Sequence, residues 1–248
     1  MHTYAIGDIH GHIGLLRHQH ALIAVDQAAH GAAPVVHVGD LVDRGPDSRG
    51  VIDYLLAGQS RGEDWVVLKG NHDRMFQLFV DGDGAQDPGL RTDLSWLHPR
   101  IGGSSTLASY GLRNPGDRPF PPVLAEAKAA VPEEHRAFLR GLPTMYRRGE
   151  AVFVHAGIRP GVALETQAEN DLVWIRAGFL DDTRDHGVLV VHGHTALDAP
   201  CHYGNRLNID SGAAYGGPLT TVVIEGRMAW QLTEAGRMPL QAPLGWRP

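Results

Sequence analysis

The stretch VVHVGDLVDRGPDSRG, residues 35–50, changes from apolar to polar within a few residues. Its apolar start, Val35–Val38, is mostly β-branched and is followed by Gly39, which predicts a short strand buried on both faces, as in a parallel sheet. Asp40 then stands at the carboxyl end of that strand. Ligands of open α/β folds bind beyond the carboxyl ends of the strands, because several loops converge there. The stretch therefore predicts a functional site near Asp40.

Four further segments repeat this order of an apolar run followed by polar residues. They are TYAIGDIHG (3–11), WVVLKGNHD (65–73), AVFVHAG (151–157) and VLVVHGHT (188–195). If the five strand ends meet, they bring one set of polar side chains to one place, namely Asp8, His10, Asp40, Asn71, His155 and His194.

Length and composition agree with a single α/β domain over residues 1–248. A chain of 248 residues with 43% hydrophobic content can bury one full core. The net charge of −6 argues against a nucleic-acid partner held through its phosphates. One cysteine, Cys201, excludes an internal disulfide and suits a reducing compartment. No signal peptide or membrane-spanning run is visible, so we expect a soluble, cytoplasmic protein.

The spacing of apolar residues indicates how the elements are ordered. Residues 12–29 and 48–58 have helical spacing, so the chain begins β-α-β-α-β, which implies a parallel sheet. Residues 81–150 differ, and we expect a mostly helical insertion there, with helices broken at Pro132. The segments 206–212, 218–226 and 228–233 are typical of strands, the last two joined as a hairpin across Glu225 and Gly226.

The residue types at the strand ends indicate a metal site. Carboxylate and amide oxygens with imidazole nitrogens are ligands for Mn, Fe or Zn. Six such residues are too many for one tetrahedral ion and suit two ions about 3.5–4 Å apart, which clamp a phosphoryl group. Asp40 is the natural bridge between them. Taken singly, each residue is more often a turn residue, a helix cap or a core histidine; the joint pattern favours the metal site.

Five motifs in order resemble the signature of the calcineurin-like metallophosphoesterases, in their phosphoprotein phosphatase branch. They are GDIHG (7–11), GDLVDRG (39–45), GNHD (70–73), HAG (155–157) and HGHT (192–195). Asp73 and Ala156 stand where eukaryotic members carry Glu and Gly, which points to bacterial and phage-type serine/threonine phosphatases and their diadenosine tetraphosphatase relatives. NIDSGAAYGG (208–217) is also similar to a bacterial family segment. The resemblance implies a four-layer α-β-β-α sandwich with a helical insertion.

The resemblance also assigns two sets of metal ligands. The first set would be Asp8, His10 and Asp40, and the second would be Asp40, Asn71, His155 and His194. His192 precedes the glycine that the family ligand follows, so we expect it to be a wall of the site or a core histidine. His12, His37 and His202 have no role in the motifs.

The same resemblance gives the residues of catalysis. His72 would be the general acid that protonates the leaving oxygen, and Asp43 would orient its ring. Arg44 and Arg176 would bind phosphate oxygens, with Asn71 also touching substrate. The nucleophile would be a hydroxide that bridges two divalent metal ions, for which Mn is the first expectation and Fe or Zn the alternatives.

Three functions remain open at this point. The leading one is a phosphomonoesterase of the serine/threonine protein phosphatase type, acting on a phosphoprotein or a small phosphate ester. The second is a bis(5'-nucleosyl)-tetraphosphatase or another nucleotide pyrophosphohydrolase, which needs a nucleobase platform. The third, a catalytically inactive binding module, is disfavoured by the intact motifs. The insertion decides between the first two, and in it GGSSTLASYG (102–111) either faces substrate with its hydroxyls and Tyr110 or is a structural loop.

Overall fold

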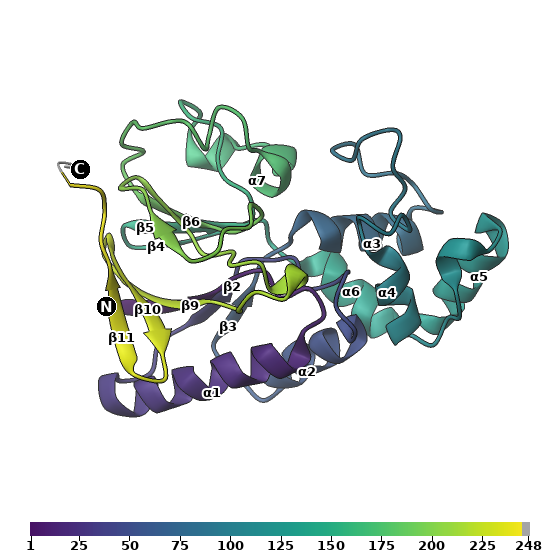
Figure 1. Cartoon of the computed structure of the whole chain (residues 1–248), viewed down its shortest axis with the longest axis horizontal. Helices are drawn as coiled ribbons and strands as arrows, with labels where there is room; N and C mark the ends of the chain where they lie inside the picture. The colour runs from purple at the N-terminus through teal and green to yellow at the C-terminus, as the bar shows by residue number, and fades with distance from the viewer. Residues whose placement is uncertain (245–248) are drawn as a thin grey trace.

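The protein forms two mixed β-sheets that lie face to face (Figure 1), in a computed structural model that describes residues 1–244. The first sheet contains, in spatial order, β11 (Gly236–Leu240), β10 (Met228–Thr233), β9 (Thr221–Glu225), β1 (His2–Ile6), β2 (Val35–His37) and β3 (Trp65–Val67). The second contains β4 (Met145–Arg148), β5 (Ala151–Val154), β6 (Leu189–His192), β8 (Arg206–Asn208) and β7 (Cys201–His202).

Helices complete the outer layers. The long helices α1 (Ile13–His30) and α2 (Ser48–Ser60) cover the outer face of the first sheet, and α7 (Glu169–Trp174) covers that of the second (Figure 1). At one end of the sandwich stand α3 (Asn71–Asp81), α4 (Gly103–Ser109), α5 (Phe120–Ala130) and α6 (Glu133–Gly141). Three short 3-10 helices, η1 (Pro115–Asp117), η2 (Leu164–Thr166) and η3 (Ala213–Tyr215), lie in the connections.

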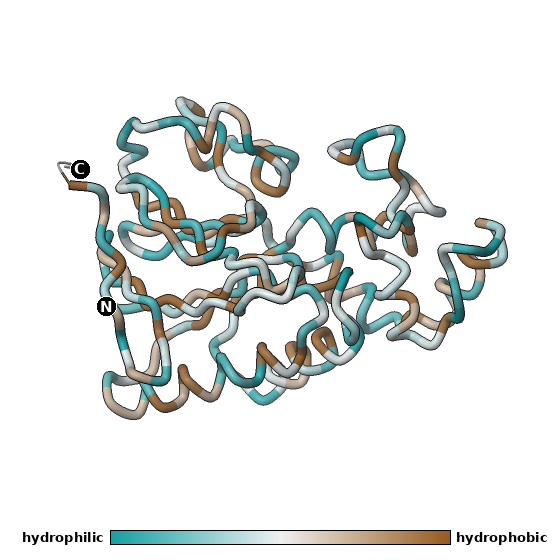
Figure 2. The backbone as a smooth tube through the Cα atoms, in the orientation of Figure 1, coloured by the Kyte–Doolittle hydropathy of each residue, from teal (hydrophilic) through white to brown (hydrophobic). Residues whose placement is uncertain are grey.

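Alternation along the strands explains the layers. Tyr4 and Ile6 of β1 are buried with Leu16 of α1, whereas Ala5 points into the core between the two sheets. Figure 2 shows hydrophobic and hydrophilic segments alternating along α1, whose buried residues are the apolar Leu16 and Ile23 and the polar Gln19 and Asp26. On the far face of the second sheet Val190 packs with Leu172 of α7. The α-β-β-α sandwich predicted from the sequence is therefore confirmed.

The strand that opened the sequence analysis is buried on both faces, as predicted. Val35 lies in the core beneath α1 and α2, and Val36 lies between the sheets. Strands β1, β2 and β3 are parallel neighbours, which confirms the β-α-β-α-β order. The predicted hairpin is also present, because β9 and β10 pair antiparallel on either side of a turn at Gly226 and Arg227.

Some elements differ from the expectation. Residues 145–148 lie inside the stretch expected to be mostly helical, but they form β4, which pairs antiparallel with β5. Residues 82–102 form turns, and the helices of this stretch occupy 103–109, 120–130 and 133–141, with the expected break at Pro132. Strand β11 was not predicted, because its sequence GRMPL has neither alternation nor β-branched residues. Within residues 1–244 no helix is both long and apolar enough to cross a bilayer.

Candidate metal centre and active site

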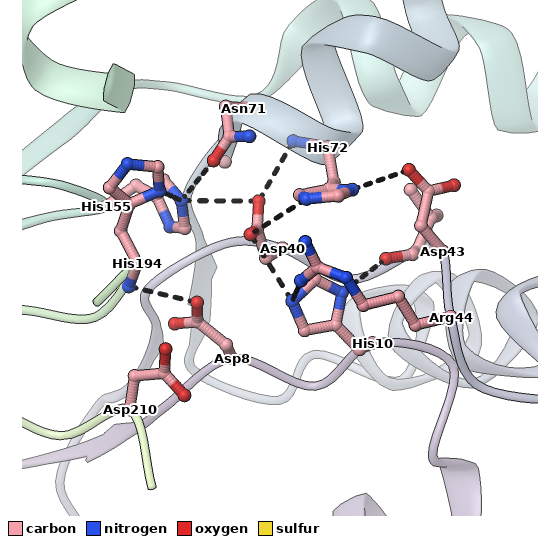
Figure 3. A network of polar contacts seen from close by, with 12 residues as sticks. Asp8, His10, Asp40, Asp43, Arg44, Asn71, His72, His155, His194 and Asp210 are labelled. Atoms are coloured by element: carbon pink, nitrogen blue, oxygen red, sulfur yellow. Dashed lines mark hydrogen bonds and ion pairs between the residues drawn. The ribbon is translucent and has the colours of Figure 1, made fainter. Parts of the chain in front are cut away.

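The loops that follow five strands meet at one end of the sandwich (Figure 3). The β1 loop carries Asp8 and His10, the β2 loop carries Asp40, and the start of α3 after β3 carries Asn71 and His72. The second sheet contributes His155 after β5 and His194 after β6. All these side chains are buried. The structure thus brings the six expected ligand residues together.

Asp40 lies at the centre of this cluster. Its Oδ1 is 3.3 Å from His155 Nε2, and its Oδ2 is 3.5 Å from His10 Nε2. Two groups of side chains in the described part of the chain could hold a metal ion, one of His10, Asp40 and His72 and one of Asp40, His155 and His194. Both groups include Asp40, so the geometry matches two ion sites that share a carboxylate.

The histidine tautomers leave the Nε2 atoms of His10 and His155 as acceptors, and both atoms lie near the Asp40 carboxylate. His10 Nδ1 donates to the Val42 carbonyl (2.8 Å) and His155 Nδ1 donates to the Val38 carbonyl (3.0 Å), so both Nε2 atoms are acceptors when the rings are neutral. Burial lowers the pKa of both rings. His155 Nε2 nevertheless lies 2.9 Å from Asn71 Oδ1 and 3.2 Å from His194 Nδ1. Such a convergence of electron-rich atoms fits a cation among them.

The buried carboxylates of the cluster also indicate a bound cation. Asp8 Oδ2 accepts a hydrogen bond from the His194 backbone (3.0 Å), while Asp8 Oδ1 is buried without a hydrogen-bond partner among residues 1–244. Burial raises the pKa of Asp8 well above its usual range, and the neighbouring Asp210 and Asp40 raise it further. Burial also raises the pKa of Asp210 to about 6. Buried carboxylates this close are costly unless a cation compensates them, so the residues present fit a metal pair.

Backbone strain is concentrated at the same place. Seven non-glycine residues of the described chain have positive φ, and five of them belong to the site, namely His10, Asp40, Asp43, Arg44 and His194. L-residues adopt this region at a cost, and such residues cluster where function requires it. Close packing adds a second constraint, because a Cβ at Gly193 would lie 1.9 Å from Asp8 Oδ1, so only glycine fits there.

His72 is held by a carboxylate network. Its Nδ1 lies 2.6 Å from Asp43 Oδ2, and its Nε2 faces Asp40 Oδ2 at 4.0 Å. Asp43 also accepts hydrogen bonds from Trp96 Nε1 (2.8 Å) and Thr106 Oγ1 (2.7 Å). Trp96 was not predicted as a site residue, and Thr106 was expected only as one of the hydroxyls of residues 102–111, which either face substrate or form a structural loop.

Two arginines border the cluster. Arg44 Nη1 donates to His10 Nε2 (2.9 Å), and Arg176 Nη2 donates to the His194 carbonyl (3.1 Å). Both side chains line a hollow of about 820 Å³, together with Asp8, His10, Asp40, Asn71, His72 and His194. The guanidinium groups of these two arginines are therefore placed to bind the oxygens of a phosphate at the cluster.

The histidines without a motif role lie elsewhere. His192 is buried against Phe179, donates from Nδ1 to the Gly193 carbonyl (3.0 Å) and accepts at Nε2 from Arg206 (3.3 Å). It does not line the hollow, so of the two expectations the core histidine holds. His37 contacts His20 at 2.9 Å beneath α1 and is likewise a core residue.

Asp210 and Tyr215 also line the hollow, and neither was predicted. Asp210 follows β8 as Asp40 follows β2, so the strand-end pattern in RLNID could have identified it. Tyr215 is 71% exposed, and its ring lies 5.3 Å from the Arg44 guanidinium carbon. Tyr110, by contrast, is buried and hydrogen-bonded to His135, so it does not face substrate.

The fold and this cluster, with its two candidate ion groups, match a metallohydrolase, and comparison with known families agrees. Residues 1–218 match the family described as calcineurin-like phosphoesterase, and the chain belongs to that family. It is therefore a metal-dependent phosphoric ester hydrolase.

Two curated relatives have different substrates in their names. Serine/threonine-protein phosphatase 1 of Salmonella typhimurium is 30% identical over 237 residues, covering 90% of this chain and 92% of that protein. The asymmetrical bis(5'-nucleosyl)-tetraphosphatase PrpE of Geobacillus thermodenitrificans is 27% identical and covers 90% of each chain. A solved structure described as a candidate diadenosine tetraphosphatase has a TM-score of 0.62 at 22% identity, covering 98% of this chain and 95% of that one, which supports the fold.

Proposed function

We propose that this protein is a dinuclear metal-dependent phosphomonoesterase of the serine/threonine protein phosphatase type. The observation that supports this most is that Arg44, Arg176 and His72 line one hollow with Asp40, which both candidate ion groups share, while the buried Asp43 contacts His72 from behind. A phosphate monoester needs these parts: cations for its free oxygens and an acid for its leaving oxygen.

The metal ligands in this proposal form two sets that share Asp40. Asp8, His10 and Asp40 hold one ion, and Asp40, Asn71, His155 and His194 hold the other. When bound there, such ions would activate a water molecule and neutralise charge on the phosphate. Mn is the proposed metal, with Fe or Zn as alternatives, because nitrogen and oxygen donors are mixed.

The side chains around the ions then have separate tasks. Arg44 and Arg176 bind phosphate oxygens through their planar guanidinium groups, and Asn71 contacts the substrate beside them. His72 donates a proton from Nε2 to the leaving oxygen. Asp43 accepts from Nδ1 and fixes the orientation of the ring, so that Nε2 faces the substrate.

The test of this proposal is a substrate panel with the Mn-loaded enzyme. Phosphoserine and phosphothreonine peptides, an aryl phosphate and diadenosine tetraphosphate are compared by kcat/KM. We expect the phosphopeptides and the aryl phosphate to be hydrolysed more efficiently than the dinucleotide. If diadenosine tetraphosphate were hydrolysed more efficiently than the phosphopeptides and the aryl phosphate, the protein phosphatase proposal would be wrong and the tetraphosphatase would take its place.

One observation favours the tetraphosphatase as the second candidate. A second hollow of about 740 Å³ adjoins the first, and the two share Arg44, Arg100, Ala214 and Tyr215. One face of the Tyr215 ring lies against Arg44 and the side chain is mostly exposed, so a nucleobase could stack there. Arg100 adds a cation for a second phosphate.

Tyr215→Ala distinguishes the two candidates. If a nucleobase stacks on Tyr215, the variant should raise KM for diadenosine tetraphosphate about tenfold, since base stacking contributes about 1–3 kcal/mol. KM for the aryl phosphate should stay within about twofold. The matched control is Tyr203→Ala, which also removes a tyrosine from an arginine but lies outside both hollows. An unchanged KM for the dinucleotide would show that no nucleobase stacks on Tyr215.

The two histidines of HGHT give a test of the ligand assignment. His194→Ala should reduce the bound metal from two ions to one per chain, because a ligand is lost. His192→Ala should retain both ions, since that ring is bonded to Arg206 and Gly193. Metal analysis of the two purified variants measures this. If the His192 variant lost an ion while the His194 variant kept both, the motif would be misassigned.

A further inference from the structure

The Asp43 carboxylate is fully buried, and both of its oxygens are held from outside the metal cluster. Oδ2 accepts from Trp96 Nε1 (2.8 Å) in addition to its contact with His72, and Oδ1 accepts from Thr106 Oγ1 (2.7 Å). The Thr106 hydroxyl also accepts from the Asp43 backbone N–H (2.8 Å), and it lies 3.0 Å from Ser48 Oγ. The carboxylate therefore has a fixed position and a fixed rotation.

Trp96 and Thr106 belong to one stretch, residues 96–106, which we name the clamp segment. Between them the Gly102 carbonyl accepts from the Arg44 backbone N–H (3.3 Å). Gly102 has φ +95°, and a Cβ there would lie 2.5 Å from Arg44 N, so the approach requires glycine. The clamp segment thus packs on Asp43 and Arg44, whose φ angles of 72° and 67° are strained.

The clamp segment is also fixed to the helix that carries His72. The Trp96 ring stacks on Phe76 of α3 (centroids 5.3 Å apart) and contacts Phe79 of the same helix (4.6 Å). One indole therefore contacts the helix that bears the imidazole and donates to the carboxylate that orients it. The distance between His72 and Asp43 therefore depends on where the Trp96 ring lies.

We propose that Trp96 and Thr106 are positioning residues for the general acid. Trp96 holds Asp43 Oδ2 against His72 Nδ1, and Thr106 prevents the carboxylate from rotating. The His72 ring is then kept in the one orientation in which Nε2 faces the substrate. Neither residue lines the hollow, so neither touches substrate. The inference rests on the proposed acid role of His72 and goes beyond it.

Trp96→Phe is the main test, because phenylalanine keeps an aromatic ring against α3 and removes the indole N–H donor, together with the volume of the five-membered ring, whose loss would affect both substrates alike. We expect kcat for an alkyl phosphate to fall about tenfold, since a hydrogen bond to a charged group is lost. For an activated aryl phosphate, whose leaving oxygen needs little protonation, kcat should change less than about twofold. KM and the metal content should be unchanged. Trp230→Phe, the same substitution on β10, should change none of these values.

Thr106 is tested by rescue. Thr106→Val should reproduce the selective loss for alkyl phosphates, and Thr106→Ser, which retains the hydroxyl, should restore kcat to within about twofold of the unmodified enzyme. A structural role alone would reduce turnover of both substrates equally, and that result for Trp96→Phe would overturn the positioning role. Unchanged alkyl-phosphate turnover in Trp96→Phe would overturn it as well.

A double variant separates this proposal from the acid role on which it rests. In a His72→Asn background, Trp96→Phe should cause no further loss, because the ring that it positions is absent. If His72→Asn leaves alkyl-phosphate turnover intact, the acid role and the positioning role both fail. If His72→Asn acts as expected but the two substitutions have additive effects, only the positioning role fails.

Discussion

Removal of divalent metal with a chelator is expected to abolish hydrolysis of every phosphate ester, and Mn is expected to restore it better than Mg or Ca. Each candidate ion site combines imidazole nitrogens with the Asp40 carboxylate. Mg and Ca favour oxygen ligands, whereas imidazole suits transition metals. The measurement is aryl phosphate hydrolysis after chelation, dialysis and titration with each metal, with metal content determined on the same samples.

The control for this experiment is the fold of the chelated enzyme. Circular dichroism and size-exclusion elution before and after chelation separate loss of an ion from loss of the chain fold. Restoration by Mn within minutes then shows that the site had remained assembled. Full activity in a metal-free, folded sample would remove the two-metal mechanism altogether.

The parts of the site that the sequence predicted are those that follow from local pattern. An apolar run ending in glycine and Asp marks the end of a buried strand, and the ends of β1, β2 and β3 meet because these strands are parallel neighbours. The contribution of the second sheet is different. His155 donates to the Val38 carbonyl across a separation of 117 residues, and no local pattern predicts that contact. The prediction that residues of the second sheet join the site came only from the order of the five motifs along the chain.

Trp96, which was not predicted, acts through a contact that no local pattern marks. Trp96 lies among turns, where the chain has no periodicity, and its partner Asp43 is 53 residues earlier. A tryptophan in such a loop predicts burial but not the acceptor of its N–H. Strand β4 was also not predicted, because MYRR is short and polar and becomes a strand by pairing with β5.

Asp73 is a buried residue that accepts hydrogen bonds from two loops of the site. Its Oδ2 accepts from the Gly70 backbone (2.8 Å) and its Oδ1 accepts from the Leu41 backbone (2.9 Å). One buried carboxylate thereby joins the loops that carry Asp40 and His72. Burial raises the pKa of Asp73 to about 8, and the nearby Asp40 contributes to the rise. Gly70 permits the close approach, since a Cβ there would lie 2.2 Å from Asp40 N.

His72 lies between a candidate ion group and the Asp43 carboxylate, and these two contacts correspond to different chemical roles. Its Nε2 lies 4.0 Å from Asp40 Oδ2, close enough for the ring to belong to a candidate ion group with His10. Its Nδ1 contacts the buried Asp43, as expected for an imidazole that is oriented to transfer a proton. The two roles predict different results when His72 is replaced. Loss of a general acid lowers turnover more for a poor leaving group than for a good one, whereas loss of a metal ligand lowers turnover for all leaving groups.

His72→Asn is expected to lower turnover of an alkyl phosphate by about 10²–10⁴, the usual contribution of general acid catalysis, and that of an activated aryl phosphate much less. Asparagine keeps a polar side chain at the start of α3 but has no transferable proton at neutral pH, so the loss should follow the pKa of the leaving group. Rates for a series of phosphate esters, with metal content measured on the same protein, test this. Two ions should stay bound, and KM should change little because Arg44 and Arg176 are intact. An equal loss for all esters, or the loss of one ion, would show that His72 is a ligand, and the group of His10, Asp40 and His72 would then be the first ion site as it stands.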